Sequence, residues 1–346
     1  MHALAIENRE MNSSDAPQAK REERPTLKTI ARISGLAMTT VSRALGDAPD
    51  ISSDTKERVR KIADEIGYVP NRAGVRLRTG KTNVISLVLA TEQGTLNMTS
   101  DLISAITNGL EGTRYHLVMI PEPKDQDPLR AIRNIVETRS ADAVIFNQVM
   151  PEDPRVTYLR QKNFPFVTHG RSKWAADHSY YDYDNIAFGR IAVERLVARG
   201  RKQILLLAPP TAQSYARDII KGATMAAEDL GVSLKVANTI SSDSEKDPLI
   251  IGMRDYLKVK PAFDAMICAS PNSAMIATKA IEDAGYVIGD QFDVFAKETF
   301  PFLDIFRTGI LSVHEDVQKA GRFLAKAAIH EITQKDGSHM QEIERP

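Results

Sequence analysis

Short apolar runs alternate with amphipathic helical patterns from residue 82 to residue 346. The runs are continuously apolar, which is typical of strands that are covered on both faces in a parallel sheet. One sheet of ordinary size does not hold so many strands. We therefore expect residues 82–346 to form an α/β core of two interleaved subdomains, side by side with a cleft between them.

The expected elements of this core follow from the spacing of its apolar residues. The expected strands are Val84–Leu89, Tyr115–Ile120, Ala143–Phe146, Phe166–Thr168, Gln203–Ala208, Leu234–Ala237, Ala265–Cys268 and Val294–Ala296. The expected helices are Leu102–Leu110, Pro128–Thr138, Asn185–Ala198, Asp218–Leu230, Ser273–Ala284 and Val317–Glu331.

A smaller helical domain is expected at residues 25–70. Its first helix has the i, i+3, i+4 spacing of one buried face. The apolar residues with this spacing are Leu27, Ile30, Ala31 and Ile33. Gly35 permits the positive-φ turn that lets a second helix cross the first. Ser52 caps a third helix that Gly67 ends, so the pattern predicts a three-helix bundle containing a helix-turn-helix.

The outer face of the second helix carries small hydroxyl side chains and one arginine. Hydroxyls bond phosphate oxygens, and an arginine fork matches guanine O6 and N7. Residues 24–81 contain 12 Lys and Arg against 6 Asp and Glu, a net charge of +6 in a chain whose total is zero. Because local positive charge releases counterions from DNA, we interpret this domain as a DNA-binding headpiece rather than a solvated helical hairpin.

The run from Thr26 to Leu77 resembles the lactose-repressor/galactose-repressor (LacI/GalR) family of bacterial transcription regulators. The resemblance rests on three patterns, L-x-x-I-A, G-x-x-x-T-T-V-S-R-A-L and I-G-Y-x-P-N-R. The headpiece residues that it implies for DNA contact are Thr29, Met38, Thr39, Thr40, Ser42 and Arg43.

The resemblance also implies a role for each position on the second helix. Met38 and Thr39 would open the recognition helix and face bases. Thr40 and Ser42 would hold phosphates, and Arg43 would serve both the groove and the backbone. Met38 has no strong donor, so it would read a thymine methyl group or the shape of the groove.

Residues 71–81 are either a basic linker or, as the resemblance implies, a hinge helix that forms on DNA. In the second case, Leu77 from each chain of a dimer wedges into a minor-groove step and kinks the site. Gly74 departs from the family pattern, which usually has alanine at this position. Glycine destabilises a helix relative to alanine. The hinge residues implied for DNA contact are Asn71, Arg72, Arg76 and Leu77.

The core that the resemblance implies is periplasmic-binding-protein-like, with a small-molecule effector in its cleft. Ligands in such sheets bind beyond the carboxyl ends of strands, and this rule selects polar and aromatic residues. The effector-binding candidates are Thr91, Glu92, His169, Arg171, Trp174, Tyr183, Asp184, Tyr215, Arg217, Asn272, Lys297 and Glu298. Since relatives continue beyond the position of Pro346, we expect the last strand to be short or missing.

Several of these positions depart from the family pattern. Ile219 stands where arginine is common, and Asn272-Ser273 replaces an asparagine-aspartate pair. Ala296-Lys297-Glu298 replaces a glycine-aromatic-aspartate triplet. The replacements are largely polar, so we expect a carbohydrate effector, a glucoside or disaccharide. A purine or another co-repressor is the alternative.

A carbohydrate-acting enzyme and a solute-binding protein are the alternatives from other functional classes. His169 with Glu92 or Glu298 could form the acid/base pair of a carbohydrate-acting enzyme, but no spacing forces them together and no catalytic or metal-binding motif is present. A solute-binding protein requires an export signal, whereas residues 1–24 read as a polar disordered tail. The single cysteine, Cys268, excludes an internal disulfide, and no apolar stretch is long enough to span a membrane.

The sequence therefore predicts a cytoplasmic homodimer without metal or cofactor. It would bind a near-palindromic operator as a repressor of carbohydrate utilisation, because one recognition helix reads too few base pairs for genomic specificity. A sugar-like effector would control its affinity for that operator.

Overall fold

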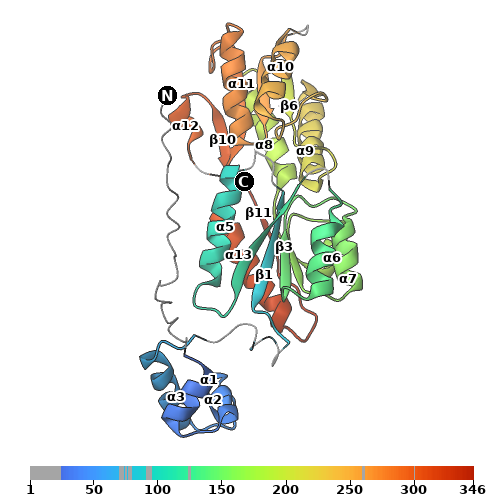
Figure 1. The fold of residues 1–346 in the computed structure, drawn as a ribbon. Coiled ribbons are helices and arrows are strands. Elements are labelled where there is room, and N and C mark those ends of the chain that lie inside the picture. The colour runs from blue at the N-terminus through green and yellow to red at the C-terminus, as the bar shows by residue number, and fades with distance from the viewer. Residues whose placement is uncertain are drawn as a thin grey trace, which may run out of the picture. The chain divides into compact units, whose positions relative to one another are not determined.

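The computed structural model describes residues 25–69, 74, 76, 80–90, 96–123, 126–258, 262–299 and 301–346. The chain divides into two compact units, Met1–Gly80 and Lys81–Pro346 (Figure 1). The expected tail at residues 1–24 and most of the expected hinge lie outside the described residues. None of the described helices is long and apolar enough to cross a bilayer.

Within the described residues 25–69 of the first unit lie three helices: α1 Leu27–Ser34, α2 Met38–Leu45 and α3 Ser53–Glu65. Thr26 and Ser52 cap α1 and α3 with their side chains, and Gly35 ends α1 at a φ of 72°. The buried core between the three helices consists of Ile30, Val41, Ala44, Val59 and Ala63. The expectation for Ile33 is wrong, since its side chain is 48% exposed and Ser34 is buried instead. The inward face of α1 runs along positions 27, 30, 31 and 34, and position 33 lies on its flank.

Six strands form the first sheet of the second unit, in the order β11-β5-β4-β3-β1-β2 with parallel pairing throughout. They are β1 Val84–Ala90, β2 His116–Glu122, β3 Ala143–Phe146, β4 Phe166–His169, β5 Ser179–Tyr183 and β11 Gln341–Glu344. One face is covered by α5 Leu96–Leu110 and α13 Val317–Thr333, and the other by α6 Leu129–Thr138 and α7 Pro154–Gln161. A short 3-10 helix, Ala175–Asp177, lies between β4 and β5.

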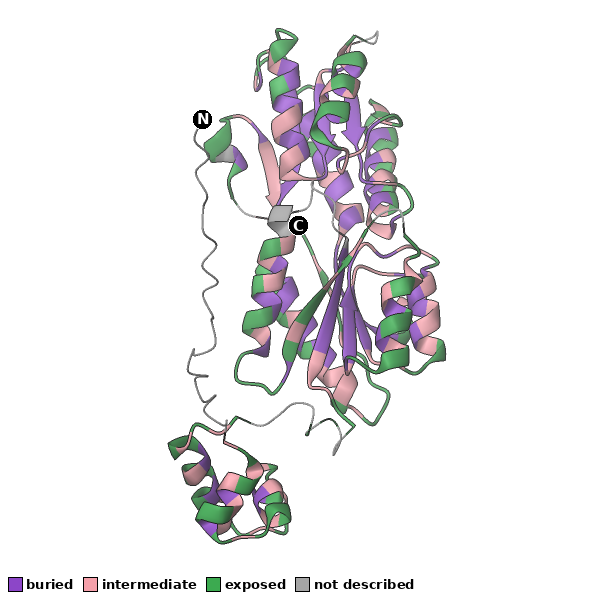
Figure 2. Cartoon of the chain, in the orientation of Figure 1, coloured by how far each residue is buried: buried purple, intermediate pink, exposed green. Residues whose placement is uncertain are grey.

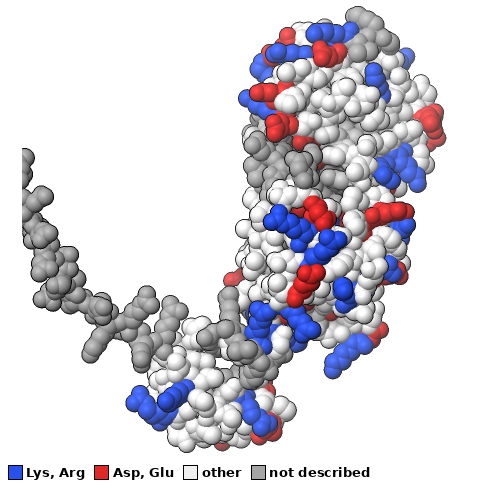
Figure 3. All heavy atoms as spheres, turned by 45° about the vertical axis from the view of Figure 1, so that its right-hand side comes forward, with Lys and Arg blue, Asp and Glu red and all other residues white. Residues whose placement is uncertain are grey.

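Alternate residues of these strands enter two different cores, as the pleat of a strand requires. Ile145 packs with α5 and α13, whereas Phe146 packs with α6 and α7. Figure 2 shows the central strands buried between helices that are exposed on their outer faces. Charged side chains of both signs lie interspersed on the face of the second unit that Figure 3 shows. Burial on both faces is the reason that the strands read as continuous apolar runs.

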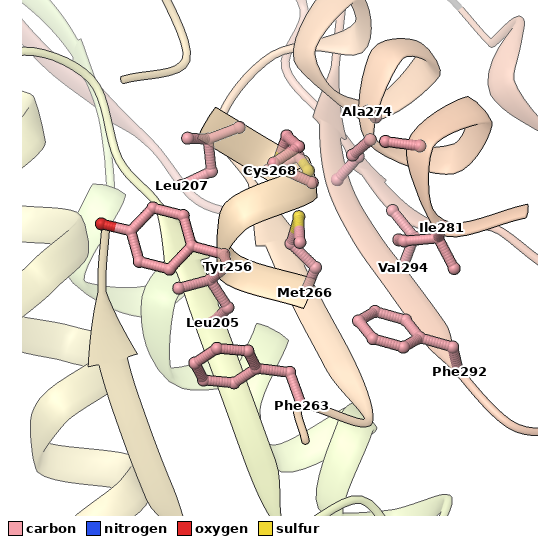
Figure 4. Close-up of a cluster of buried hydrophobic side chains, with 14 of the residues drawn as sticks. Leu205, Leu207, Tyr256, Phe263, Met266, Cys268, Ala274, Ile281, Phe292 and Val294 are labelled. Carbon is pink, nitrogen blue, oxygen red and sulfur yellow. The ribbon is translucent and has the colours of Figure 1, made fainter. Parts of the chain in front are cut away.

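Five parallel strands form the second sheet, in the order β10-β9-β8-β6-β7. They are β6 Gln203–Leu207, β7 Ser233–Val236, β8 Ala265–Cys268, β9 Asp293–Glu298 and β10 Leu311–His314. One face is covered by α8 Asn185–Ala198 and α9 Ser214–Leu230, and the other by α10 Lys246–Leu257 and α11 Pro271–Asp283. Figure 4 shows the second of these cores, where Met266, Cys268 and Val294 face Tyr256 and Ile281. The short helix α12, Leu303–Phe306, precedes β10.

Helices α8 and α9 pack closely because each has a glycine at their contact. A Cβ atom on Gly222 would lie 2.0 Å from the carbonyl oxygen of Ile186, and one on Gly189 would lie 2.3 Å from that of Ile219. Ile219 itself is fully buried in this core. The apolar residue at position 219 therefore serves helix packing.

The chain passes twice between the two sheets, after Tyr183 at the end of β5 and after His314 at the end of β10. The predicted class, a helix-turn-helix unit followed by two parallel α/β subdomains, is confirmed. The expected elements did not include β5, β10, α7, α10 or α12, and the last strand was expected to be short or missing. The last strand, β11, is present and four residues long, paired with β5.

Candidate functional site

The outward face of α2 presents the side chains that were expected to meet DNA. Met38 is 54% exposed, and Thr39 and Arg43 are also exposed. Thr40 and Ser42 are half-buried. Outward exposure is necessary for groove contact, and these five residues have it to different degrees.

Thr29 has a structural role in the headpiece. Its hydroxyl oxygen accepts a hydrogen bond from the backbone N–H of Thr26 at 3.1 Å, and Thr26 caps α1 in return. This reciprocal pair satisfies backbone donors at the start of the helix. The sequence prediction assigned Thr29 to DNA contact without this role.

Three cations of the headpiece pair with two aspartates of the loop between α2 and α3. Arg43 pairs with Asp50, while Lys56 and Arg60 pair with Asp47 at 3.1 and 2.8 Å. The hydrogen bond from Lys56 is the largest of the contacts that hold the pKa of Asp47 below its usual value. DNA phosphates would therefore compete with loop carboxylates for these side chains.

The predicted hinge contacts Asn71, Arg72 and Leu77 lie outside the described residues, so their roles remain predictions. Arg76 is helical, and its carbonyl oxygen accepts a hydrogen bond from the N–H of Gly80 at 2.8 Å. Thr91 and Glu92, from the predicted effector site, also lie outside the described residues.

A cleft of about 670 Å³ lies between the two subdomains of the second unit. The first sheet and its helices contribute Ser100, Asp101, Asn147, Gln148, His169, Gly170, Asp182 and Tyr183. The second contributes Pro209, Tyr215, Ser242, Asp243, Ala269, Ser270, Pro271, Asn272, Met275, Lys297, Thr299 and Phe302. Asn185 and Glu315 come from the two places where the chain passes between the sheets. Polar side chains and apolar ones, several of them aromatic, therefore line the cleft together.

Five of the predicted effector residues line this cleft together: His169, Tyr183, Tyr215, Asn272 and Lys297. Strand ends bring them there, as the rule for parallel sheets requires. The cleft lining does not include Arg171, Trp174, Asp184, Arg217 or Glu298.

The five predicted residues that do not line the cleft make other contacts in the fold. Trp174 packs beside α7, with the ammonium of Lys173 4.8 Å from its ring centroid. The carboxylate of Asp184 caps α8 by accepting from the N–H of Ala187 at 3.0 Å. Trp174 therefore does not lie where it could serve as a platform for a sugar in the cleft.

Arg217 and Glu298 bond to backbone near the cleft. Arg217 is exposed and donates from Nε to the carbonyl oxygen of Thr211 at 3.0 Å. Glu298 is buried and accepts from the N–H groups of Phe302 and Leu303 at 3.2 and 3.1 Å, which fixes the start of α12. Glu298 is the last residue of β9 and Arg217 lies near the start of α9. Their side chains bond to these neighbouring groups, and neither lines the cleft.

Arg171 connects the two subdomains at the edge of the cleft. Its Nε donates to Asp182 at 2.5 Å, and its Nη2 lies 3.6 Å from Asp218 on α9. Burial raises the pKa of Asp182 to about 6 even though Arg171 opposes the shift. Asp182 is thus a cleft carboxyl that titrates close to neutral pH.

The loop after β3 supplies Asn147 and Gln148, which the sequence prediction missed. The buried guanidinium of Arg155 donates from Nη2 to the carbonyl oxygens of both residues, at 3.2 and 3.0 Å. Asp153 and Glu122 accept from the same guanidinium at 2.8 and 2.9 Å. Arg155 therefore fixes this wall of the cleft. The strand-end rule applied to Ala143–Phe146 would have found Asn147.

The floor of the cleft contains a buried charged cluster. The Nζ atom of Lys297 lies 2.7 Å from Glu315 Oε2 and donates to Asn185 Oδ1 at 3.1 Å. His169 Nε2 lies 3.8 Å from Glu315 Oε1. Burial lowers the pKa of His169, while Lys297 and His169 outweigh burial and hold the pKa of Glu315 below its usual value. The cluster contains an ammonium, a carboxylate and a neutral imidazole near neutral pH.

Family models match nearly all of the described chain. Residues 26–71 match the model for bacterial regulatory proteins of the lacI family. Residues 82–343 match the model for periplasmic binding proteins and the sugar binding domain of the LacI family.

Curated relatives match along most of the chain. The HTH-type transcriptional regulator AglR of Rhizobium meliloti (strain 1021) is 30% identical over 329 residues, which cover 92% of this chain and 91% of AglR. The HTH-type transcriptional regulator RafR of Escherichia coli is 36% identical over 192 residues, 55% of this chain and 57% of RafR.

Solved structures share the fold. The complex of the transcriptional regulator CelR with cellobiose matches with a TM-score of 0.68 at 22% identity, covering 93% of this chain and 97% of the other. The lac repressor dimer bound to operator and the anti-inducer ONPF matches with a TM-score of 0.78 at 19% identity and the same coverage.

Proposed function

The chain belongs to the LacI family of bacterial regulatory proteins, and from that premise we propose that it represses a carbohydrate-utilisation operon under the control of a sugar bound in its cleft. Like its family and its relatives, it is a DNA-binding transcriptional regulator; it is not an enzyme.

The cleft is the observation that carries the sugar proposal. Its volume of about 670 Å³ lies within the range of about 300 to 1,000 Å³ found for small-molecule sites. Hydroxyl, amide and carboxylate groups face it from both subdomains, as at Ser242, Asn147 and Asp243. Tyr215 and Phe302 add aromatic surface. Sugars need this combination, because their hydroxyls require paired hydrogen bonds and their C–H faces pack against rings.

The size and charge of the cleft favour a neutral disaccharide or glucoside. The CelR structure is a complex with cellobiose, and a disaccharide for this chain is consistent with that relative. The described lining contains four carboxylates, Asp101, Asp182, Asp243 and Glu315, but only one Lys or Arg, Lys297. That balance disfavours an anionic ligand.

The DNA half of the proposal requires two chains, since two headpieces read the two halves of a near-palindrome. We propose a homodimer formed by the second unit. Val118 and Met119 on the edge strand β2 are 43% and 56% exposed, and Ile305 on α12 is 79% exposed. Exposed apolar residues on a sheet edge and a helix are typical of interaction surfaces. The lac repressor structure, a neighbour by fold, is a dimer on operator DNA.

Control of DNA binding would act through the two passages of the chain between the sheets. A sugar that contacts both subdomains changes their relative placement, and this alters the spacing of the paired hinges where Leu77 is expected to wedge into the minor groove. The resulting coupling free energy is typically about 1 to 3 kcal/mol. Such a regulator acts where the chromosome is, in the cytoplasm.

The test combines DNA selection with a ligand screen. Operator sequences are selected from random duplexes with the full chain, and thermal unfolding is followed with mono- and disaccharides and, in a separate arm, purines. Stabilisation by a neutral disaccharide that Asn272→Ala reduces supports the proposal. Stabilisation by purines alone, or no selected DNA sequence, contradicts it.

A further inference from the structure

The ammonium of Lys297 sits in a buried aromatic and polar surrounding at the floor of the cleft. The residue is 8% exposed. Its Nζ lies 4.8 Å from the ring centroid of Tyr183, 5.8 Å from that of Phe188 and 5.9 Å from that of Tyr215. Aromatic faces attract a cation in such a position. The cation is thus held in the floor rather than extended toward solvent.

Glu315 is the counter-ion of this ammonium. Its carboxylate is 5% exposed and lies 2.7 Å from Lys297 Nζ, so the two charges neutralise each other in a place with little water. Asn185 Oδ1 accepts a further hydrogen bond from Lys297 at 3.1 Å. A buried ion pair holds strongly when other groups satisfy the remaining donors.

No other fixed positive charge lies in the described part of the cleft lining, where Lys297 is the single Lys or Arg. Burial lowers the pKa of His169, which keeps its imidazole neutral beside Glu315 at neutral pH. Arg171 is directed to Asp182 and Asp218 at the edge. An anionic ligand would therefore have to pair with the ammonium of Lys297, which is already paired with the carboxylate of Glu315.

We propose that Glu315 is a specificity-determining residue that excludes phosphorylated and acidic sugars from the cleft by serving as the internal counter-ion of Lys297. This inference rests on the proposed sugar-binding function and names the residue that restricts its ligand class. Replacing the carboxylate by an amide of the same shape frees the charge of Lys297 for a ligand. The cleft then gains affinity for anions.

The experiment compares the full chain with Glu315→Gln in calorimetric titrations. The ligands are a neutral disaccharide from the thermal screen, its 6-phosphate and inorganic phosphate. Wild type should bind the neutral sugar at least tenfold more tightly than the 6-phosphate. In Glu315→Gln this preference should fall at least tenfold, and millimolar phosphate should raise the Tm of the variant alone.

Two matched controls separate the charge of Lys297 from general effects. Glu298→Gln neutralises the adjacent carboxylate, which faces α12 outside the cleft, and should keep the ligand preference of wild type. The double variant Lys297→Met with Glu315→Gln removes the ammonium and should lose the gained phosphate response.

Three outcomes decide the proposal. Equal preference in wild type and a folded Glu315→Gln overturns it. If the variant does not fold, tight binding of the 6-phosphate by wild type overturns it and at least tenfold rejection supports it. If no sugar binds wild type, the proposed function fails, while stabilisation of Glu315→Gln by phosphate still supports the role of Glu315 and its absence overturns that role.

Discussion

The phenol of Tyr183 donates a hydrogen bond to the carbonyl oxygen of His314 at 3.2 Å, which ties together the two places where the chain passes between the sheets. Tyr183 ends β5 and His314 ends β10. Tyr183 also lines the cleft. One side chain thus contacts both the ligand site and the segments that a subdomain movement must bend.

Tyr183→Phe should lower the free energy of unfolding by about 0.5 to 1.5 kcal/mol, the usual net value of one hydrogen bond. It should also change the factor by which the sugar alters operator affinity, because the tie spans both passages. Denaturant unfolding and DNA titrations with and without sugar measure the two effects.

Tyr181→Phe is the matched control. It removes a bond of 2.6 Å to Glu344 within the first sheet, so it should lower stability without changing the coupling. Equal coupling changes in both variants would contradict the role given to Tyr183.

Much of the fold was predictable because burial on both faces leaves a plain mark in the sequence. The expected strands Ala143–Phe146 and Ala265–Cys268 coincide with β3 and β8. Strand β5 was missed because its sequence, Ser-Tyr-Tyr-Asp-Tyr, carries buried polar groups such as Asp182. Arg171 satisfies that carboxyl from a loop, and no local pattern shows such a partner.

The sequence predicted the position of the cleft but only some of the residues that line it. Strand ends locate a site but not the direction of each side chain, so Tyr215 faces the cleft and the neighbouring Arg217 does not. Glu315 was missed because it follows β10, a short strand that the apolar pattern did not reveal. Its ion pair with Lys297 depends on tertiary contact between segments that the sequence leaves unconnected.

Arg43→Ala should weaken binding to the selected operator far more than to random DNA, by about 1 to 3 kcal/mol if Arg43 reads a base edge. Arg76→Ala, if it contacts phosphate alone, should weaken both similarly. Electrophoretic or anisotropy titrations at fixed salt measure the ratio. Asp50→Asn is the control, because it releases Arg43 from its ion pair and should not weaken operator binding. Equal losses on both DNAs for Arg43→Ala would count against base readout.

Gly222→Ala should destabilise the second unit, because the new methyl group would collide with the backbone of Ile186. Overpacking of this kind typically costs about 1 to 3 kcal/mol, which thermal or denaturant unfolding measures. Gly252→Ala is a matched helical comparison, since the atoms nearest to its new methyl group belong to the side chain of Ile240 and not to backbone. A Gly222→Ala protein as stable as the Gly252→Ala protein would contradict the close packing of α8 and α9.

The carboxyl of Asp182 should make both stability and sugar affinity depend on pH. Its pKa rises from 3.8 to about 6 on folding, so the folded state binds the proton more tightly. Its contribution to stability is therefore fully present below about pH 4 and is lost as the pH rises through about 6. The loss is up to about 3 kcal/mol, since one pKa unit corresponds to about 1.4 kcal/mol.

Asp182→Asn removes this titration. The difference in unfolding free energy between wild type and the variant should change between pH 4 and pH 6 and level off above it, and NMR titration should locate the carboxyl directly. A constant difference across that range would show that Asp182 does not titrate there.

The central claim is that one chain couples its cleft to its headpiece. Its most direct test is the affinity of the full chain for its selected operator, measured at fixed salt with and without a saturating disaccharide from the thermal screen. We predict a change of about 5- to 150-fold, the usual range of such coupling, and its loss at the same sugar concentration in Asn272→Ala. A sugar that binds the cleft while operator affinity stays the same would contradict the account.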